Sequence, residues 1–167
     1  SESGLTREKI FEILENKPYF IGEKGPELTG SGNYSIPVRS SASYSIAAVL
    51  YCFDSNNKPQ AYKYGEYDWI HFDQIQWYRE QSDQYTRLSN KILPSLAFFH
   101  ITLLEFNEVV GKEKTIGIKK ERIASPTINS GLLGSLVEKK DVMGIFVGHD
   151  HNNDFIGIEQ DIALAFG

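Results

Sequence analysis

The sequence lacks the features that cross-link a protein, anchor it in a membrane or give it a block of like charge. It contains one cysteine, Cys52, so no disulfide can form within it. The formal net charge of -5 includes no block of basic residues, which argues against tight binding to the phosphate backbone of long nucleic acids. No run approaches the roughly 18 apolar residues of a membrane span, and no signal-peptide pattern is visible. We therefore expect that the protein binds neither nucleic acid nor a membrane. The sequence does not identify its cellular compartment.

The composition that is present suits a globular protein. At 167 residues, with 41% hydrophobic and 13% aromatic residues, the chain can bury a sizeable core, and we assign residues 1–167 to a single domain. Cys52 lies inside an apolar run, where a small buried thiol is favoured over a reactive nucleophile. The chain starts without methionine and stops directly after an apolar run, so we expect both ends to be cut from a longer protein.

Hydrophobic periodicity and turn residues predict helices alternating with strands. Thr6 is the expected N-cap of a first short helix, and the first two strands are expected to pair as a hairpin. This pattern indicates an α/β (α+β) protein. Helices are predicted over residues 5–14, 73–88 and 132–140, and strands over residues 34–38, 44–53, 96–101, 142–147, 155–158 and 162–166.

Three of the four histidines stand where apolar, strand-like runs end. His149 and His151 flank Asp150 in a Gly-His-Asp-His run directly after residues 142–147, and His100 ends another apolar run. Two residues apart in extended or loop structure, His149 and His151 can face the same side. Imidazole suits zinc, iron and manganese. From spacing alone, a metal site and a set of hydrogen-bonded histidines at strand ends both stay open.

The histidine runs resemble a known family. Residues 148–155, with Phe99-His100 upstream, are similar to the last two metal-binding blocks of the calcineurin-like metallophosphoesterases, and most similar to the purple acid phosphatase-like branch. The prolines that family members often carry shortly after the upstream histidine are absent here. Supporting motifs follow the order of this branch over nearly the whole chain: Trp69-Ile70, Gln74, Trp77, Glu105-Phe106, Ser125-Pro126 and Asn129-Ser130-Gly131.

The resemblance implies both a fold and a set of metal ligands. The fold would be a metallophosphoesterase-type mixed β-sandwich flanked by helices, of which this chain is roughly the second half. His100 and His149 would share one metal ion, and His151 would bind the neighbouring ion. Asn153 and Asp154 are expected to orient a histidine ring or the following turn. The proton donor to the leaving group would lie outside this chain, so no catalytic acid or base is expected within it.

Three ligand blocks of the family are missing from the sequence: an Asp-x-His, a Gly-Asp and a Gly-Asn-His-Asp. A two-metal phosphoester site needs a bridging carboxylate, which three histidines cannot supply. Residues 1–8 resemble the segment directly after the third block in this branch, so we expect the C-terminal part of a metallophosphoesterase domain. The intact protein would hold two iron, manganese or zinc ions and hydrolyse a small phosphorylated substrate. The chain alone would be inactive or nearly so, with at most one weakly held ion.

A second class of function stays open beside the first. In it the chain is a non-enzymatic module that binds one metal ion through its histidines, or none. If the first half of the β-sandwich is missing from this chain, strand edges and an apolar sheet face would be exposed. We therefore expect homodimerisation, or partial disorder near the N-terminal end where the chain would be cut.

Other polar and aromatic residues have simpler interpretations. A capping or surface role is favoured for His71, and turn or cap roles for Asp54, Asp68 and Asp141. The tyrosines of residues 62–67 either line a substrate cleft or cover a sheet edge.

Overall fold

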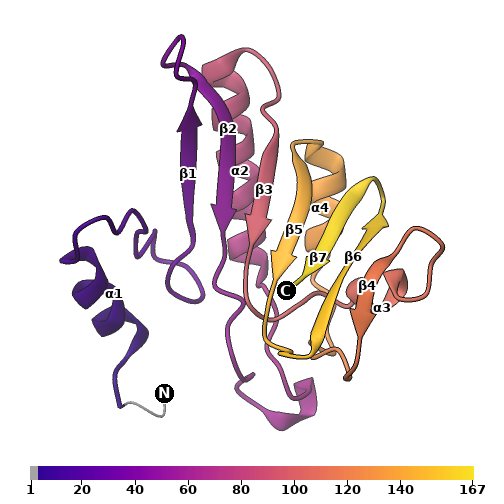
Figure 1. The fold of residues 1–167 in the computed structure, drawn as a ribbon. Helices are drawn as coiled ribbons and strands as arrows, with labels where there is room; N and C mark the ends of the chain where they lie inside the picture. The colour runs from indigo at the N-terminus through magenta and orange to yellow at the C-terminus, as the bar shows by residue number, and fades with distance from the viewer. Residues whose placement is uncertain (1–3) are drawn as a thin grey trace.

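One mixed sheet of seven strands organises the protein. The computed structural model describes residues 4–167; residues 1–3, where the resemblance to the segment after the third ligand block begins, lie outside the described residues. The strand order is β1-β2-β3-β5-β7-β6-β4 (Figure 1). The strands are β1(Tyr34–Arg39), β2(Ile46–Cys52), β3(Ser95–Phe98), β4(Ile116–Lys119), β5(Val142–Val147), β6(Asn153–Glu159) and β7(Ile162–Phe166).

The middle of the sheet is parallel and its margins are antiparallel. Strands β2, β3, β5 and β7 run in one direction. Strand β1 forms the predicted hairpin with β2, and β6 and β4 add antiparallel pairs at the other side. Neighbouring parallel strands end at the same edge of a sheet, so the loops that leave β3 and β5 emerge side by side.

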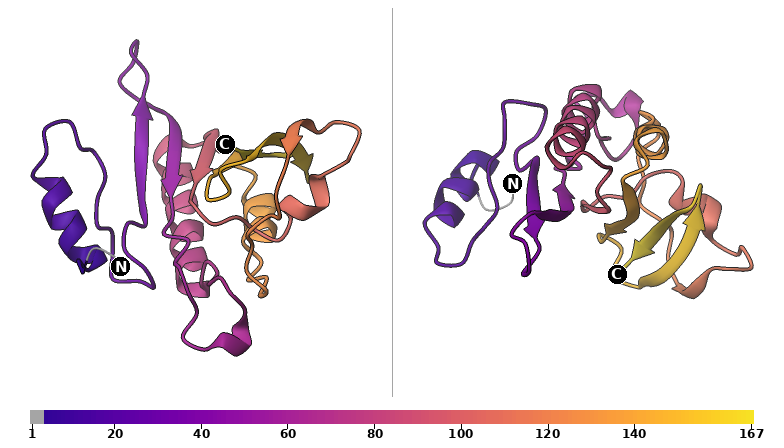
Figure 2. Two further views of the ribbon diagram at one scale, coloured as in Figure 1. Left: turned by 60° about the horizontal axis from the view of Figure 1, so that its bottom comes forward. Right: turned by 90° about the horizontal axis from the view of Figure 1, so that it is seen from above.

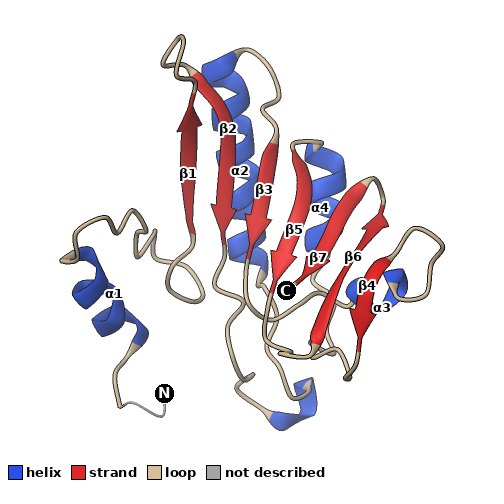
Figure 3. Ribbon diagram, in the orientation of Figure 1, coloured by secondary structure: helices blue, strands red, loops and turns tan. Residues whose placement is uncertain are grey.

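Helices cover one face of the sheet (Figures 2 and 3). The long helix α2 and the shorter α4 contact each other, and α4 also contacts β5. The core lies between these helices and the sheet, where Tyr51, Tyr78, Leu136 and Ile145 are 0% exposed. The helices are α1(Arg7–Glu15), the 3-10 helix η1(Tyr62–Tyr64), α2(Phe72–Ser89), α3(Phe106–Val109) and α4(Leu132–Lys139).

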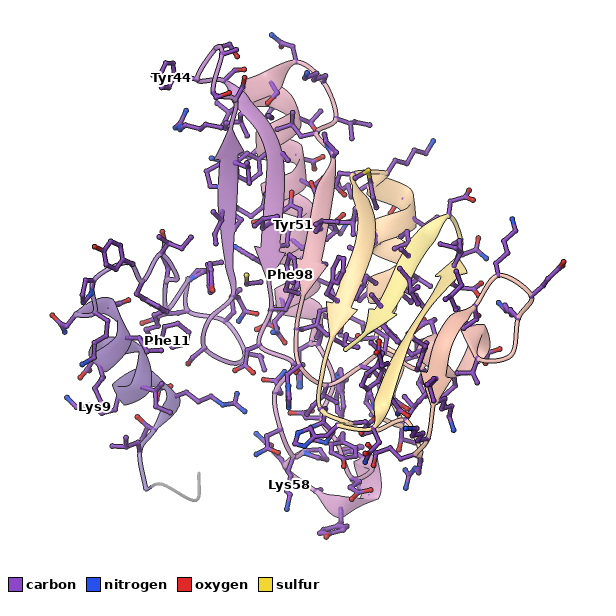
Figure 4. The ribbon with its side chains drawn as sticks, viewed as in Figure 1. Lys9, Phe11, Tyr44, Tyr51, Lys58 and Phe98 are labelled. Carbon is purple, nitrogen blue, oxygen red and sulfur yellow. The ribbon has the colours of Figure 1, made fainter. Side chains whose placement is uncertain are left out.

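Helix α1 lies beside the sheet rather than on it (Figure 1). Thr6 caps it as predicted, because the Thr6 hydroxyl accepts a hydrogen bond from Lys9 N. No residue of α1 is buried. Phe11 points from α1 toward the connector that leads into β1 (Figure 4), and a Cβ on Gly32 would lie 2.5 Å from the end of this ring. Glycine is therefore required at position 32, where φ is also positive at 96°.

The opposite sheet face is apolar, and no helix among residues 4–167 covers it (Figure 2). The strand register aligns an apolar row across all seven strands, and a second such row runs beside it. Ile156 and Phe146, from the first row, are 39% and 38% exposed, which is unusual for large apolar residues in a sheet. The first row is Tyr34, Cys52, Phe98, Phe146, Ala165, Ile156 and Ile116. The second is Ile36, Leu50, Leu96, Gly144, Ala163 and Ile158.

Most predicted elements are confirmed, with shifts at their ends. The strand predicted over residues 96–101 ends at Phe98, and the helix predicted over residues 73–88 gains one residue at each end. Helix α3 and strand β4 were not predicted. None of the helices in residues 4–167 has the length and apolarity that a membrane span requires.

Two residue assignments are corrected. Asp141 is not a turn or cap residue: it is 4% exposed, and its carboxylate accepts hydrogen bonds from the hydroxyl groups of Tyr51 and Tyr78. Cys52 is half-buried rather than buried, because its side chain belongs to the uncovered sheet face. Partial burial raises the pKa of the Cys52 thiol, and a hydrogen bond with Tyr34 opposes that rise. Asp54 and Asp68 do bind turn backbone, at Asn56 N and Trp69 N.

Candidate metal centre

Two of the predicted ligands meet at the ends of adjacent parallel strands. His100 follows the end of β3, and His149 follows the end of β5. The strand pairing continues past both ends, because Gly148 N donates to His100 O at 3.1 Å. On the other side of His100, the buried hydroxyl of Ser55 accepts a hydrogen bond from Ile101 N at 2.8 Å. The backbone around His100 is therefore fixed from two directions.

The two imidazoles point at each other. His149 Nδ1 lies 3.1 Å from His100 Nε2, and the ring centroids are 5.0 Å apart with an interplanar angle of 80°. Such a contact needs one proton between the two nitrogens. A metal ion would replace this proton and take a lone pair from each ring. Two nitrogens that are each about 2.1 Å from one ion lie about 3.0 to 3.4 Å apart, so the observed separation fits a shared ion.

The surroundings keep the His100 ring in the form that binds metal. Partial desolvation lowers the pKa of His100, and the charges of His149 and His151 lower it further, while Asp150 opposes them. A lowered pKa means that the neutral imidazole predominates at neutral pH. Only the neutral ring offers a lone pair to a metal ion.

His149 sits in a tightly held turn. Its φ is +85°, a backbone conformation that residues other than glycine seldom adopt. Strain of this kind persists only where the surroundings enforce it. Here the Asp150 carboxylate accepts a hydrogen bond from Ala124 N at 2.9 Å, and the Asn153 carboxamide accepts from Lys120 N and Glu121 N at 3.0 and 3.1 Å.

The two auxiliary residues have different surroundings. Asn153 is 3% exposed, and its carboxamide oxygen accepts hydrogen bonds from the backbone of residues 120 and 121. The role predicted for it beside the histidines stays a prediction. Asp154 is exposed on β6, and its backbone pairs with Ile118.

The third predicted ligand stands apart from the pair. His151 belongs to the same turn, its side chain is exposed, and its charge reaches His100. Among residues 4–167, no group of three or more His, Cys, Asp or Glu side chains is arranged to hold a metal ion. The described part of the chain thus offers one pair of nitrogen donors with no carboxylate arranged to complete a ligand set. The assignment of all three histidines as ligands stays a prediction.

The fourth histidine has the structural role predicted for it. His71 is the N-cap of α2 and forms a capping box with Gln74. Its ring stacks on Trp69, with centroids 4.7 Å apart, and its Nε2 lies 3.1 Å from the Asp68 carboxylate. Helix capping accounts for His71 fully.

A groove of about 570 Å³ adjoins the imidazole pair. His100 and His149 line one side of it, and α1 and the connector line the other. Arg7 brings a guanidinium group, which is paired with Asp54, and Asn56 and Asn57 bring amide groups. This lining combines cationic and hydrogen-bonding groups, as an anionic small molecule requires.

One contact of the site was not anticipated from the sequence. The ring of Tyr67 packs edge-on against His149, with centroids 5.1 Å apart and an interplanar angle of 82°. The tyrosine-rich segment was a signal for either a cleft or a sheet edge, but it did not single out Tyr67. The contact joins positions 67 and 149, which no local pattern relates.

Comparison with known proteins places these features in a family. No family model matches the chain. The chain is 31% identical over 182 residues to "Probable inactive purple acid phosphatase 29" of Arabidopsis thaliana, covering 99% of this chain and 47% of that protein. It is 30% identical over 183 residues to "Probable inactive purple acid phosphatase 14" of the same plant, covering 99% and 46%. It is 33% identical over 167 residues to "Phosphatase DCR2" of Saccharomyces cerevisiae, covering 92% and 28%.

The chain spans about half the length of the Arabidopsis relatives and corresponds to their C-terminal half. The sequence similarity to these relatives extends along nearly the whole chain, and it supports the family resemblance of the histidine runs. The chain therefore belongs to the purple acid phosphatase-like branch of the metallophosphoesterases.

Proposed function

We propose that the complete protein hydrolyses phosphate esters at a dinuclear metal centre to which this chain contributes His100, His149 and His151. The main support is the imidazole pair, in which two nitrogens from adjacent strand ends lie 3.1 Å apart, a separation that fits two ligands of one ion. Relatives whose names describe them as phosphatases also support this reaction class.

Within this proposal the chain supplies ligands rather than proton-transfer groups. His100 and His149 hold one ion, and His151 holds the second. When bound, two ions polarise the phosphoryl oxygens and activate the attacking water. The hydrogen bonds of Asp150 and Asn153 keep the His149 turn in place, and the Ser55 hydroxyl keeps the backbone next to His100 in place.

The remaining ligands would come from an N-terminal part of the complete protein, which corresponds to the part of the relatives that precedes the region matched by this chain. Carboxylates from that part would bridge the two ions, and they would have to approach the exposed side of the His100 ring. The uncovered apolar sheet face supports the presence of further packed structure, because a row of large exposed side chains such as Phe146 and Ile156 suits a second sheet. Iron, manganese and zinc all accept imidazole ligands.

The groove beside the pair suits a small phosphorylated substrate. The Arg7 guanidinium, which is also paired with Asp54, would attract the phosphoryl group, and the Asn57 amide would donate a hydrogen bond to it. We expect the substrate to be a small molecule, because a groove of about 570 Å³ is within the range of ordinary ligand sites.

The test is an assay of the complete protein with a chromogenic phosphomonoester in the presence of manganese, iron or zinc. We expect hydrolysis with at least one metal, loss of nearly all of it in His149→Ala, and retention in His71→Ala, whose histidine caps a helix. Absence of hydrolysis with every metal would contradict the proposal.

A second function is favoured by two observations. The Arabidopsis relatives carry the word "inactive" in their names, and the described residues hold no complete ligand cluster. These facts suit a module that binds one metal ion, or none, without turnover. Metal analysis of the complete protein separates the two functions, because the enzyme requires two ions and the module holds at most one.

A further inference from the structure

The imidazole of His149 contacts two other rings. One is His100, and the other is Tyr67, whose ring meets His149 edge-on at a centroid separation of 5.1 Å. Tyr67 is half-buried and comes from the loop between η1 and α2, far from both histidines in sequence. Among the hydrogen bonds of the described residues, the only side-chain partner of the His149 ring is His100 Nε2.

That single hydrogen bond cannot orient His149 once a metal ion is shared by the pair. The metal ion replaces the proton between the two nitrogens, so the hydrogen bond that orients the His149 ring in the metal-free protein is lost. Ligand histidines elsewhere are usually held by a hydrogen bond from the second ring nitrogen. His149 has no such partner in the described structure. The edge-on packing against Tyr67 does not depend on that proton and can fix the ring.

The loop that carries Tyr67 is built to be rigid. Trp69 stacks on His71 at the start of α2, with ring centroids 4.7 Å apart, and Tyr64 packs edge-on against Trp69 at 6.0 Å. Asp68 N donates to Asn57 O at 3.0 Å. At Gly65, φ is +109°, and a Cβ there would lie 2.3 Å from the Thr127 hydroxyl. The loop is thus held on both sides of Tyr67.

We propose that Tyr67 is a positioning residue that fixes the imidazole of His149 in its metal-binding orientation through ring packing. The proposal rests on the proposed function in one respect, the assignment of His149 as a ligand. The contact acts through the aromatic ring, so the Tyr67 hydroxyl is not required. The contacts of Trp69 with Tyr64 and His71 hold the part of the loop between Tyr67 and α2.

The test compares three variants of the complete protein by their affinity for Mn²⁺. Tyr67→Ala removes the ring, and we expect affinity to fall by about 10- to 100-fold, as when other groups that orient a ligand are removed. Tyr67→Phe keeps the ring, so affinity should stay within about twofold of the original protein. Tyr62→Ala, in the neighbouring 3-10 helix η1 and 93% exposed, is the matched control and should not change affinity.

A second readout does not depend on metal. In the metal-free protein, the ring protons of His149 feel the ring current of Tyr67. Their NMR resonances should shift in Tyr67→Ala, should stay near their original positions in Tyr67→Phe, and should not move in Tyr62→Ala. Equal Mn²⁺ affinity in Tyr67→Ala and the original protein would overturn the proposal, and so would an equal loss in Tyr62→Ala.

The two proposals can fail separately. A complete protein that binds Mn²⁺ but hydrolyses no phosphate ester contradicts the proposed function and leaves the role of Tyr67 to be decided by the affinities. A protein that hydrolyses phosphate esters with unchanged affinity in Tyr67→Ala contradicts only the role of Tyr67. If the complete protein binds no metal, the proposed function and the positioning role both fall, and the NMR shifts then report only the ring contact.

Discussion

Among single residues, His100 and His149 are the proposed metal ligands that the structure brings together. Their ring nitrogens lie 3.1 Å apart, and the two residues follow adjacent strand ends. The sequence indicated a meeting of this kind because both histidines follow apolar runs. It did not indicate the positive φ of His149 or the packing of Tyr67, since both depend on residues distant in sequence.

Shared coordination makes a prediction for pairs of substitutions. If His100 and His149 bind the same ion, His100→Ala and His149→Ala should each lower affinity for that ion by at least about 100-fold, more than an outer group would. The double variant should lose little beyond either single variant, because effects on one shared ligand set are not additive. Isothermal titration with Mn²⁺ measures this. Additive losses would show that the two rings act independently.

Asp73 predicts a pH effect on stability. Burial alone would raise the pKa of Asp73, but hydrogen bonds from the Thr29 amide and hydroxyl and from the Gln74 amide outweigh it and lower the pKa. Because the pKa of Asp73 is lower in the folded than in the unfolded protein, the ionised carboxylate stabilises the folded state at pH values above the unfolded-state pKa, near 3.9. This stabilisation is lost as the pH falls through the folded-state pKa.

The measurement for this pH effect is urea unfolding of Asp73→Asn and the original protein. The original protein should be more stable at neutral pH, and the difference should shrink as the pH falls below the unfolded-state pKa, near 3.9. Glu113→Gln, at an exposed position, is the control and should show no such trend. A difference that stays constant over this range would contradict the role given to Asp73.

Among the structural elements, α2 is joined to the sheet by a buried polar contact. The hydroxyl groups of Tyr78 on α2 and Tyr51 on β2 both donate to the Asp141 carboxylate, which stands just before β5. The three residues are nearly inaccessible to solvent. Their hydrogen bonds therefore fix how α2 lies across β2 and β5.

Loss of one donor at Asp141 should be costly. Tyr78→Phe leaves the buried carboxylate with one fewer partner and should destabilise the protein by about 1 to 3 kcal/mol. Tyr64→Phe, whose side chain is 39% exposed, should change stability by less than about 0.5 kcal/mol. Thermal and urea unfolding give both values. Equal stability of Tyr78→Phe and the original protein would contradict the contribution of this contact.

The predicted elements are determined mainly by their own residues, whereas the missed features depend on residues far away in the sequence. Strand β5 and helix α2 have strong periodicity, and their positions were predicted closely. Strand β4 is short and fully exposed, and it contains Gly117, whose φ of +114° matches no strand preference. It is a strand because it pairs with β6. Asp141 was misread for a similar reason, since its partners are 63 and 90 positions away.

For the molecule as a whole, the uncovered sheet face is the dominant property. Two apolar rows cross the sheet on the side that lacks helices, and Phe146, Ile156 and Ile158 are each at least 38% exposed. Contiguous apolar surface of this kind is rare on stable monomers. The Arabidopsis relatives are about twice as long as this chain.

The exposed face predicts self-association of the chain when it is produced alone. Light scattering should detect dimers or larger species, and Phe146→Asp should reduce them, because a charge would then interrupt the apolar row. Tyr62→Asp, which lies outside the face and is 93% exposed, is the control and should not change association. A monodisperse monomer would contradict this prediction.

The decisive measurement is the number of metal ions bound by the complete protein, determined by elemental analysis together with the His149→Ala variant. We predict two ions per polypeptide in the original protein and loss of at least one in the variant, with His71→Ala unchanged. A complete protein that holds one ion or none, or a His149→Ala variant that keeps both, would contradict the assignment of these histidines to a dinuclear phosphatase centre.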